Sequence, residues 1–165
     1  MAFDAFLEID GIPGESTDAG HKDCVEVKDY THNINQPMSG SASSGGGRSS
    51  ERANHGTFQI TKELDKSSPK LSLACCNGEN IKKVVLELCR AGGDKQKYMQ
   101  YEMEDVVVQS IGPEGNPAGD GNLPLERVAF AYGKITWTYT QLDGKTGKPV
   151  GDIEAHWDQT ENTGG

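Results

Sequence analysis

The sequence of 165 residues has little positive charge. Its 16 Lys and Arg stand against 25 Asp and Glu, which gives a formal net charge of −9. Nucleic-acid phosphates are bound by clustered Lys and Arg, so this balance argues against nucleic-acid binding. An acidic surface favours solubility and disfavours contact with anionic membranes.

Long apolar runs are also missing. No stretch approaches the roughly 20 apolar residues that a membrane-spanning helix requires. The N-terminal segment MAFDAFLEIDG carries Asp4, Glu8 and Asp10, where a signal peptide needs a basic start and an uninterrupted apolar stretch. The sequence therefore predicts no membrane insertion and no cleavable signal peptide.

Catalytic, cofactor-binding and metal-binding patterns are weak or absent. Gly144-Lys145-Thr146 is similar to the end of a phosphate-binding loop, but Tyr139 stands where that loop requires its first glycine. No GxSxG elbow is present, and the histidines are scattered at no ligand-like spacing. We therefore expect no enzyme activity, no cofactor and no metal. The four cysteines form no disulfide ladder and are interpreted as reduced, buried or half-buried thiols: Cys24, Cys75, Cys76 and Cys89.

The chain is instead rich in period-two alternation of apolar and polar residues, which predicts β-strands. The expected strands cover residues 3–10, 23–34, 57–61, 83–89, 98–111, 126–141 and 150–158. Turns of hairpin length join several of them, so an antiparallel sheet folded on itself is expected, as a barrel or a sandwich. Gly133, inside one expected strand, indicates a bulge or a close backbone approach.

One short helix interrupts this pattern. Ser67 or Ser68 is a candidate N-cap, and Pro69 suits the first helical turn. Asn77-Gly78 supplies a left-handed stop, so about two turns fit between the signals.

Residues 36–54 are a break in composition, dominated by Ser and Gly. Such a segment cannot bury enough apolar area to offset its ordering entropy by itself. It is either a flexible surface loop or a protruding arm that orders against another subunit. Residues 159–165 are expected to be a frayed tail.

Several blocks, in this order and spacing, carry a family resemblance: GIPGES, the Gln36-Pro37 exit into a Ser/Gly-rich segment, ITKELDKSSPKL, IKKVVLELCRAGGDKQKYMQYEMEDVVV, YGKITWTYTQ and AHWD. Together they resemble the haemolysin-coregulated protein (Hcp) family of type VI secretion systems. The resemblance runs from Phe3 to about Asp158, so residues 1–158 are expected to form one domain.

The resemblance implies a mainly β fold, an antiparallel β-barrel of two sheets with one short α-helix at its side. It implies a structural protein of homohexameric rings that stack into a tube. A contractile sheath expels the tube, a VgrG spike caps it, and secreted effectors ride in its lumen. The protein would reside in the bacterial cytoplasm before firing and then reach the extracellular medium or a target cell. The alternative is a small-ligand-binding β-barrel, which would need an enclosed apolar cavity.

The resemblance also assigns residues to surfaces. Polar positions on the 23–34 strand become candidates for the lumen wall: Tyr30, Thr31 and Asn33. The 36–54 segment becomes an arm that reaches a neighbouring ring or subunit, which favours the arm over the flexible loop. Its candidate contact residues are Gln36, Pro37, Met38, Arg48, Glu51 and Arg52. The helix then lies against the barrel wall, with Leu71, Ala74 and Cys75 packed inward.

Overall fold

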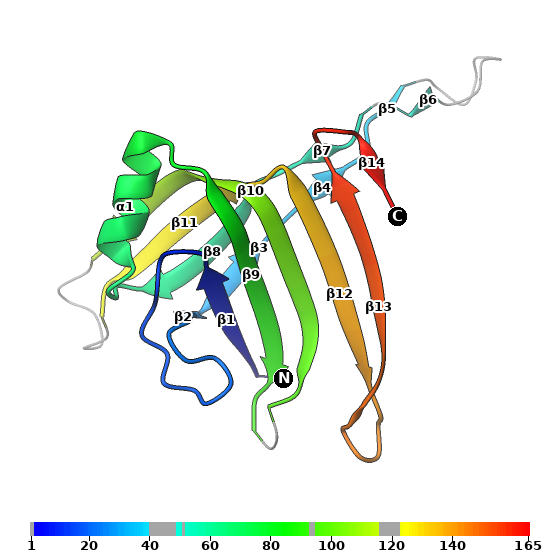
Figure 1. The fold of residues 1–165 in the computed structure, drawn as a ribbon, viewed down its shortest axis with the longest axis horizontal. Coiled ribbons are helices and arrows are strands. Elements are labelled where there is room, and N and C mark those ends of the chain that lie inside the picture. Colours follow the sequence, from blue (N-terminus) through cyan, green and yellow to red (C-terminus); the bar gives the residue numbers. More distant parts are fainter. Residues whose placement is uncertain (1, 40–48, 51, 93–94, 116–122) are drawn as a thin grey trace.

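The fold is mainly antiparallel β with one short helix at its side, as expected (Figure 1). A computed structural model describes residues 2–39, 49–50, 52–92, 95–115 and 123–165. Its helix α1 covers Ser68–Asn77. Its strands are β1 (Phe3–Ile9), β2 (Val25–Val27), β3 (Asp29–Thr31), β4 (Ile34–Asn35), β5 (Met38–Ser39), β6 (Ser49–Ser50), β7 (Asn54–His55), β8 (Phe58–Glu63), β9 (Ile81–Arg90), β10 (Lys97–Glu114), β11 (Leu125–Ala131), β12 (Lys134–Leu142), β13 (Pro149–Asp158) and β14 (Thr163–Gly164).

The long strand β10 organises the barrel. Its first half pairs with β9, which leads through β1 to β2, and its second half pairs with β11, which leads through β8 to β3. Because β2 and β3 are consecutive in the chain, the two arrays meet and the wall closes. Strands β12, β13 and β14 continue the sheet beyond the barrel, and we call these three strands the extension (Figure 1).

Two expected long strands are bent where they pass from one sheet to the other. Residues 23–34 divide into three strands, because β2 pairs with β1 whereas β3 pairs with β8. Residues 126–141 divide at Gly133, and both parts pair antiparallel with β10, with a register shift in the β11 part between Val108 and Ser110. A Cβ on Gly133 would lie 3.2 Å from the Cβ of Asp105, so the expected close backbone approach is confirmed.

The helix packs against the barrel as expected, but its first turn differs from the prediction. Leu71 and Ala74 are buried and Cys75 packs on the same core, and Gly78 ends the helix with a φ of 64°. Neither candidate serine caps the helix with its side chain. The Ser67 hydroxyl donates to Asp65 instead, and the Ser68 hydroxyl accepts the Asp65 backbone N–H at 3.2 Å.

A buried ion pair explains this rearrangement. Lys62 is fully buried, and its Nζ lies 2.8 Å from the Glu126 carboxylate and 3.0 Å from the Asp65 carboxylate. The Ser68 hydroxyl also accepts a hydrogen bond from Lys62 Nζ, at 3.1 Å. A buried ammonium requires compensating oxygens, so these polar side chains are recruited to Lys62 rather than to the helix end.

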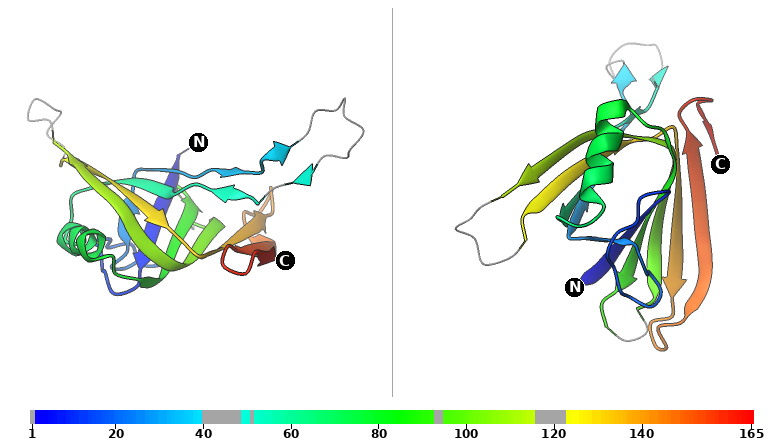
Figure 2. Two further views of the ribbon diagram at one scale, coloured as in Figure 1. Left: turned by 90° about the horizontal axis from the view of Figure 1, so that it is seen from above. Right: turned by 60° about the vertical axis from the view of Figure 1, so that its left-hand side comes forward.

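A paired ribbon leaves the barrel (Figure 2). It consists of residues 34–39, 49–50 and 52–55. Ile34 pairs with His55 at its base, and Met38 pairs with Ser50 further out. The prediction of a frayed tail at residues 159–165 is wrong, because Thr163–Gly164 forms β14 against the end of β13. The Gly165 backbone extends this pairing with two hydrogen bonds to His156.

Candidate assembly surfaces

One face of the sheet runs without interruption from inside the barrel onto the extension. Strand registers place its side chains in three rows across β1, β9, β10, β12 and β13. The rows are Ala5–Leu88–Met99–Tyr139–Ile153, Leu7–Leu86–Tyr101–Trp137–Ala155 and Ile9–Val84–Met103–Ile135–Trp157. Every member of these rows is apolar or aromatic. The alternation of apolar and polar residues along the strands therefore does not indicate where the barrel ends and the extension begins.

Burial changes along these rows. The β1 and β9 members are at most 5% exposed, whereas Tyr139 is 47% and Ile153 is 67% exposed. Val150, at the start of β13, is 65% exposed. Scattered apolar residues on a surface are ordinary, but a contiguous apolar face that continues a core marks an interaction surface. We call Trp137, Tyr139, Ile153 and Ala155 the extension face.

A second face, on the outside of the other sheet, is small and polar. Thr31 pairs with Gln59, Gln59 with Ala129, and Ala129 with Ser110, which forms one row across β3, β8, β11 and β10. No member of this row is charged. Thr31, Gln59 and Ser110 are exposed, so this row presents a neutral polar wall. Sequence reasoning found only Thr31, because the other three become its neighbours through strand register.

The three lumen candidates do not lie together. Tyr30 packs onto the core, with its ring stacked 5.9 Å from Phe58 and tilted 5.6 Å from Tyr101. Side chains alternate along a strand, so Thr31 points to the opposite, exposed face. This placement counts against Tyr30 as a lumen residue. Asn33 is exposed beyond β3, and its backbone carbonyl accepts the Gly56 N–H at 2.8 Å.

The arm candidates lie on the projecting ribbon as far as it is described. Met38 is 54% exposed, and Pro37 is half-buried beside it. The Gln36 amide donates to the Pro37 carbonyl at 3.4 Å, and Arg52 Nη2 donates to the Gln159 carbonyl at 2.6 Å. The predictions for Arg48 and Glu51 lie outside the described residues.

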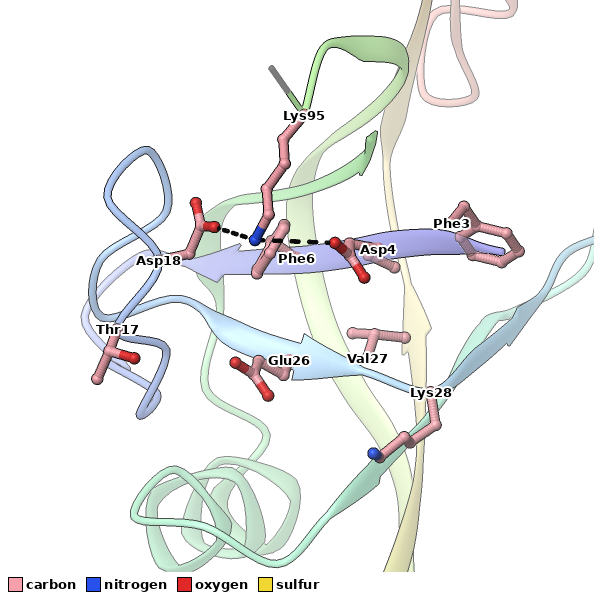
Figure 3. Close-up of a pocket in the computed structure, with 10 residues that line it drawn as sticks. Phe3, Asp4, Phe6, Thr17, Asp18, Glu26, Val27, Lys28 and Lys95 are labelled. Atoms are coloured by element: carbon pink, nitrogen blue, oxygen red, sulfur yellow. Dashed lines mark hydrogen bonds and ion pairs between the residues drawn. The ribbon is translucent and has the colours of Figure 1, made fainter. Parts of the chain in front are cut away.

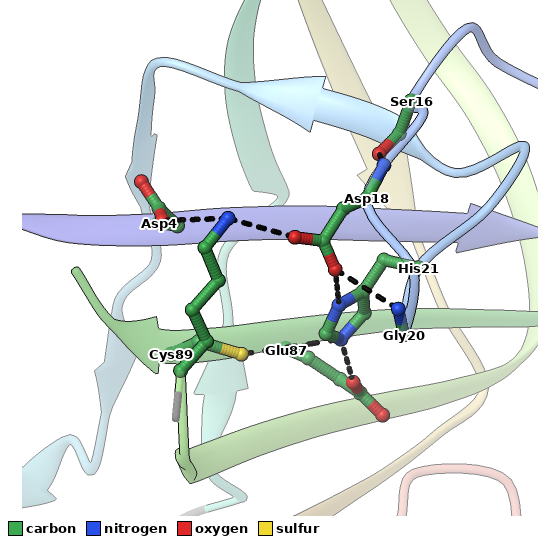
Figure 4. Close-up of polar contacts among 8 residues, drawn as sticks. Asp4, Ser16, Asp18, Gly20, His21, Glu87 and Cys89 are labelled. Carbon is green, nitrogen blue, oxygen red and sulfur yellow. Dashed lines mark hydrogen bonds and ion pairs between the residues drawn. The ribbon is translucent and has the colours of Figure 1, made fainter. Parts of the chain in front are cut away.

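A cysteine and a histidine that no sequence pattern connected meet beneath the loop before β2 (Figure 4). The Cys89 thiol lies 3.9 Å from Nε2 of His21, and the carboxylates of Glu87 and Asp18 bond the two imidazole nitrogens at 2.6 and 3.1 Å. The His21 ring stacks on Phe6 at 4.2 Å.

The pair of Cys89 and His21 is similar to a cysteine nucleophile beside a histidine base, but the properties of the thiol do not suit that role. Cys89 is fully buried. Burial, with the nearby charges of Glu87 and Asp18, raises the pKa of its thiol to about 11. The reactive species of cysteine is the thiolate, which such a pKa suppresses at neutral pH. The cluster therefore fastens the loop onto the outside of β1 and β9.

The adjoining pocket is lined by charged side chains, several of which pair with one another (Figure 3). Lys95 reaches across β1 and lies 2.8 Å from Asp18 and 3.9 Å from Asp4. Lys28 and Glu26 line the other side. Because Lys95 is engaged by two carboxylates of the chain, the pocket serves to hold the loop.

The barrel interior is filled with side chains. Its largest fully buried residues include Phe58, Phe130, Leu7, Ile60, Leu86 and Met103. A packed interior does not provide the enclosed cavity that the ligand-binding alternative requires. Among the described residues, no three His, Cys, Asp or Glu side chains gather as a metal site. In the same part of the chain, no helix is both long and apolar enough to cross a membrane.

The fold and these surfaces define a β-barrel with an exposed apolar sheet face and a projecting arm. The chain belongs to the Hcp family: the family model described as "Type VI secretion system effector, Hcp" matches residues 6–139. It is thus a tube component of type VI secretion and not an enzyme.

Individual relatives agree with this assignment. "Major exported protein" of Pseudomonas aeruginosa is 32% identical over 140 residues, which cover 81% of this chain and 78% of that protein. "Protein hcp1" of the same organism is 29% identical and covers 98% of both chains. A solved structure described as a type six secretion system protein has a TM-score of 0.93 at 31% identity, covering 99% of this chain and 100% of that one.

Proposed function

We propose that this chain forms homohexameric rings that stack into the inner tube of a type VI secretion system. The observation that carries the proposal is the extension face, where Tyr139 and Ile153 continue core rows but stay exposed in the single chain. In a ring of identical subunits, one surface of each copy must match a different surface of the next. The extension face supplies one side of such a contact, and its occupant is the barrel wall of the neighbouring copy.

The neutral polar row on the other sheet is the proposed lumen wall. Thr31, Gln59 and Ser110 offer hydrogen-bonding groups without charge and without a large apolar patch. Asp29 and Arg127 are exposed in the next row of the same face, so charged groups of both signs border this neutral row. We assign it to the passage of secreted effectors, and the Asn33 side chain borders it.

The arm is the proposed contact between stacked rings. It projects from the barrel with Met38 exposed, and Arg52 fixes its base to the turn after β13. A narrow ribbon buries less area than a sheet face, so we expect stacking to be weaker than ring formation. The VgrG spike at the tube end and the contractile sheath around the tube complete the proposed partners.

The proposed location follows from this role. Subunits are made in the bacterial cytoplasm and leave it with the tube when the sheath contracts, to the extracellular medium or a target cell. Export of this kind uses the secretion machine itself.

Electron microscopy of the purified protein tests the ring directly. Negative-stain images of concentrated protein should show rings with a central hole. A field of compact single barrels at the same concentration would overturn the proposal. In a secretion-competent strain, immunoblots should find the wild-type chain in the culture supernatant and lose it when the sheath gene is deleted.

Shortening the arm separates ring formation from stacking. Replacing residues 39–50 with a short Gly-Ser turn should leave the melting temperature and the rings unchanged, because the described ends of this segment pair only within the ribbon. Secretion and the length of any stacked tubes should fall. Loss of folding in this variant would show instead that the arm belongs to the core.

A further inference from the structure

Two histidines at the base of the arm bind the same oxygen atom of the barrel, His32 from the link between β3 and β4 and His55 from β7. His32 Nε2 lies 2.8 Å and His55 Nδ1 lies 2.7 Å from the hydroxyl oxygen of Tyr132. Tyr132 is buried at the bend between β11 and β12. His55 belongs to the ribbon pairing, opposite Ile34, and His32 lies two residues before Ile34.

A second connection joins the arm to the same tyrosine. The Gln159 side-chain amide donates to the Tyr132 carbonyl at 2.7 Å, and the Gln159 carbonyl accepts from Arg52 at 2.6 Å. His32 and His55 thus contact Tyr132 directly, and Arg52 is connected to it through Gln159. The base of the arm is held by side-chain hydrogen bonds more than by its ladder, because β4 and β7 contribute only two residues each.

The hydrogen bonds of this cluster require at least one neutral imidazole. The Tyr132 hydroxyl donates to an unprotonated nitrogen of one histidine and accepts the N–H of the other. When both imidazoles are protonated, both nitrogens are donors, and the hydroxyl proton loses its acceptor. Two positive charges then face one oxygen atom, and like charges at this range repel.

The surroundings favour the neutral forms. Burial and the proximity of His55 lower the pKa of His32, and burial lowers the pKa of His55. Phe58 of β8 and Tyr132 are the rings against His32, and Arg52 is the charged arm residue attached nearby through Gln159. Within the described ranges, no carboxylate hydrogen-bonds or ion-pairs with either histidine to stabilise its cation.

We propose that His32, His55 and Tyr132 form a pH-sensitive latch, which holds the arm against the barrel at neutral pH and releases it in acid. The direction follows from linkage. A histidine whose folded-state pKa lies below its unfolded value of about 6.5 binds more protons when the base is open. The latch is therefore complete above about pH 6.5 and weakens as the pH falls below that value.

Amide hydrogen exchange of the intact chain tests the latch, with rates corrected for the intrinsic effect of pH. Protection of the peptides that cover residues 32–36 and 52–56 should be lost progressively between pH 7.5 and pH 5, because the open base takes up protons that the closed base excludes. Peptides from β9 should keep their protection over the same range. Equal protection of the arm base at both pH values would overturn the proposal.

Matched variants identify the groups responsible. His32→Gln and His55→Asn place an amide near each bonding nitrogen but do not titrate, so the double variant should lose the pH dependence. His156→Gln, on β13, is the control and should retain it. Tyr132→Phe removes the shared oxygen and should weaken protection at both pH values. If the double variant fails to fold, each single variant should reduce the dependence, and a dependence unchanged in the foldable variants would contradict the latch. These readouts concern the single chain and do not require ring assembly.

Discussion

The barrel and the extension carry the same pattern of side chains but differ in what covers them. In the row that begins at Ala5, residues on β1 and β9 are 4% exposed, whereas Ile153 at the far end is 67% exposed. The row that begins at Ile9 stays buried as far as Ile135. The curved sheet of the barrel buries its own apolar face. The extension lies beyond this curvature, so its apolar face is exposed at Tyr139 and Ile153.

This difference in burial predicts that the barrel side chains determine the stability of the single chain, whereas the extension face determines its association with other copies. Side chains in the closed part stabilise the single chain, because folding already removes them from water. Tyr139, Ile153 and Ala155 of the extension face stay exposed in the single chain, so they gain little from folding. In the proposed ring, a second copy covers them. Substitutions in the barrel should therefore change the free energy of unfolding, and substitutions on the extension face should change the oligomeric state.

The largest effect on stability is expected at Lys62. Lys62→Ala leaves the buried Glu126 carboxylate without its ammonium partner at 2.8 Å. Removing one member of a buried pair costs about 3–5 kcal/mol of unfolding free energy. Lys28→Ala is the matched control, because its 3.4 Å pair with Glu63 is exposed and such pairs contribute about 0–1 kcal/mol. Urea denaturation that gives equal losses for both variants would refute this distinction.

Two leucines of α1 sharpen the same contrast within a single helix. Leu71 is fully buried and Leu73 is 60% exposed. Leu71→Ala should lower the free energy of unfolding by about 2–5 kcal/mol through a cavity, whereas Leu73→Ala should change it by less than about 0.5 kcal/mol. Thermal or urea unfolding measures both, and a large loss at Leu73 would mean that the helix is covered on its outer side in the isolated protein.

A smaller, pH-dependent effect is expected from the loop outside the barrel. The hydrogen bond from Lys95, followed by that from His21, lowers the pKa of Asp18 to about 2 from 3.8. A carboxylate with a depressed pKa stabilises the fold above its unfolded pKa and loses this contribution as the pH falls towards the folded one. Asp18→Asn should therefore lower the melting temperature above about pH 4, and its difference from wild type should shrink between pH 3.8 and about 2.

Asp23→Asn is the control for this titration. Asp23 pairs with Lys66 only at 3.9 Å, with both side chains well exposed. Its difference from wild type should be small at every pH. A difference for Asp18→Asn that stays constant down to pH 2 would show that its carboxylate is not the titrating group.

Alternation predicted most of the fold, because half-buried strands impose a period of two wherever they occur. It placed the strands of the barrel, whereas Pro69 and Asn77-Gly78 placed the helix. Leu71 and Ala74 of the helix face inward, as the family resemblance implied. It missed what depends on distant partners. Ser67 was a reasonable cap by sequence, but the buried Lys62 draws its neighbours into a different network.

The surfaces were predictable only in part for the same reason. Thr31 was identified by resemblance, whereas Gln59 and Ser110 join it through pairings across strands far apart in sequence. Tyr30 was grouped with Thr31 because both have polar groups, although strand alternation sends them to opposite faces. His32 and His55 showed no ligand-like spacing, and only the return of the arm to the barrel brings both to Tyr132.

The oligomeric mass of wild type and Ile153→Asp tests the central claim most directly. Sedimentation velocity over a wide concentration range should give six times the chain mass for wild type and the monomer mass for Ile153→Asp. The Ile153→Asp chain should still fold, because the side chain is exposed in the single chain. Glu154→Gln, on the opposite face of β13, should remain hexameric. A monomeric wild type, or an Ile153→Asp variant that stays hexameric, would contradict the account.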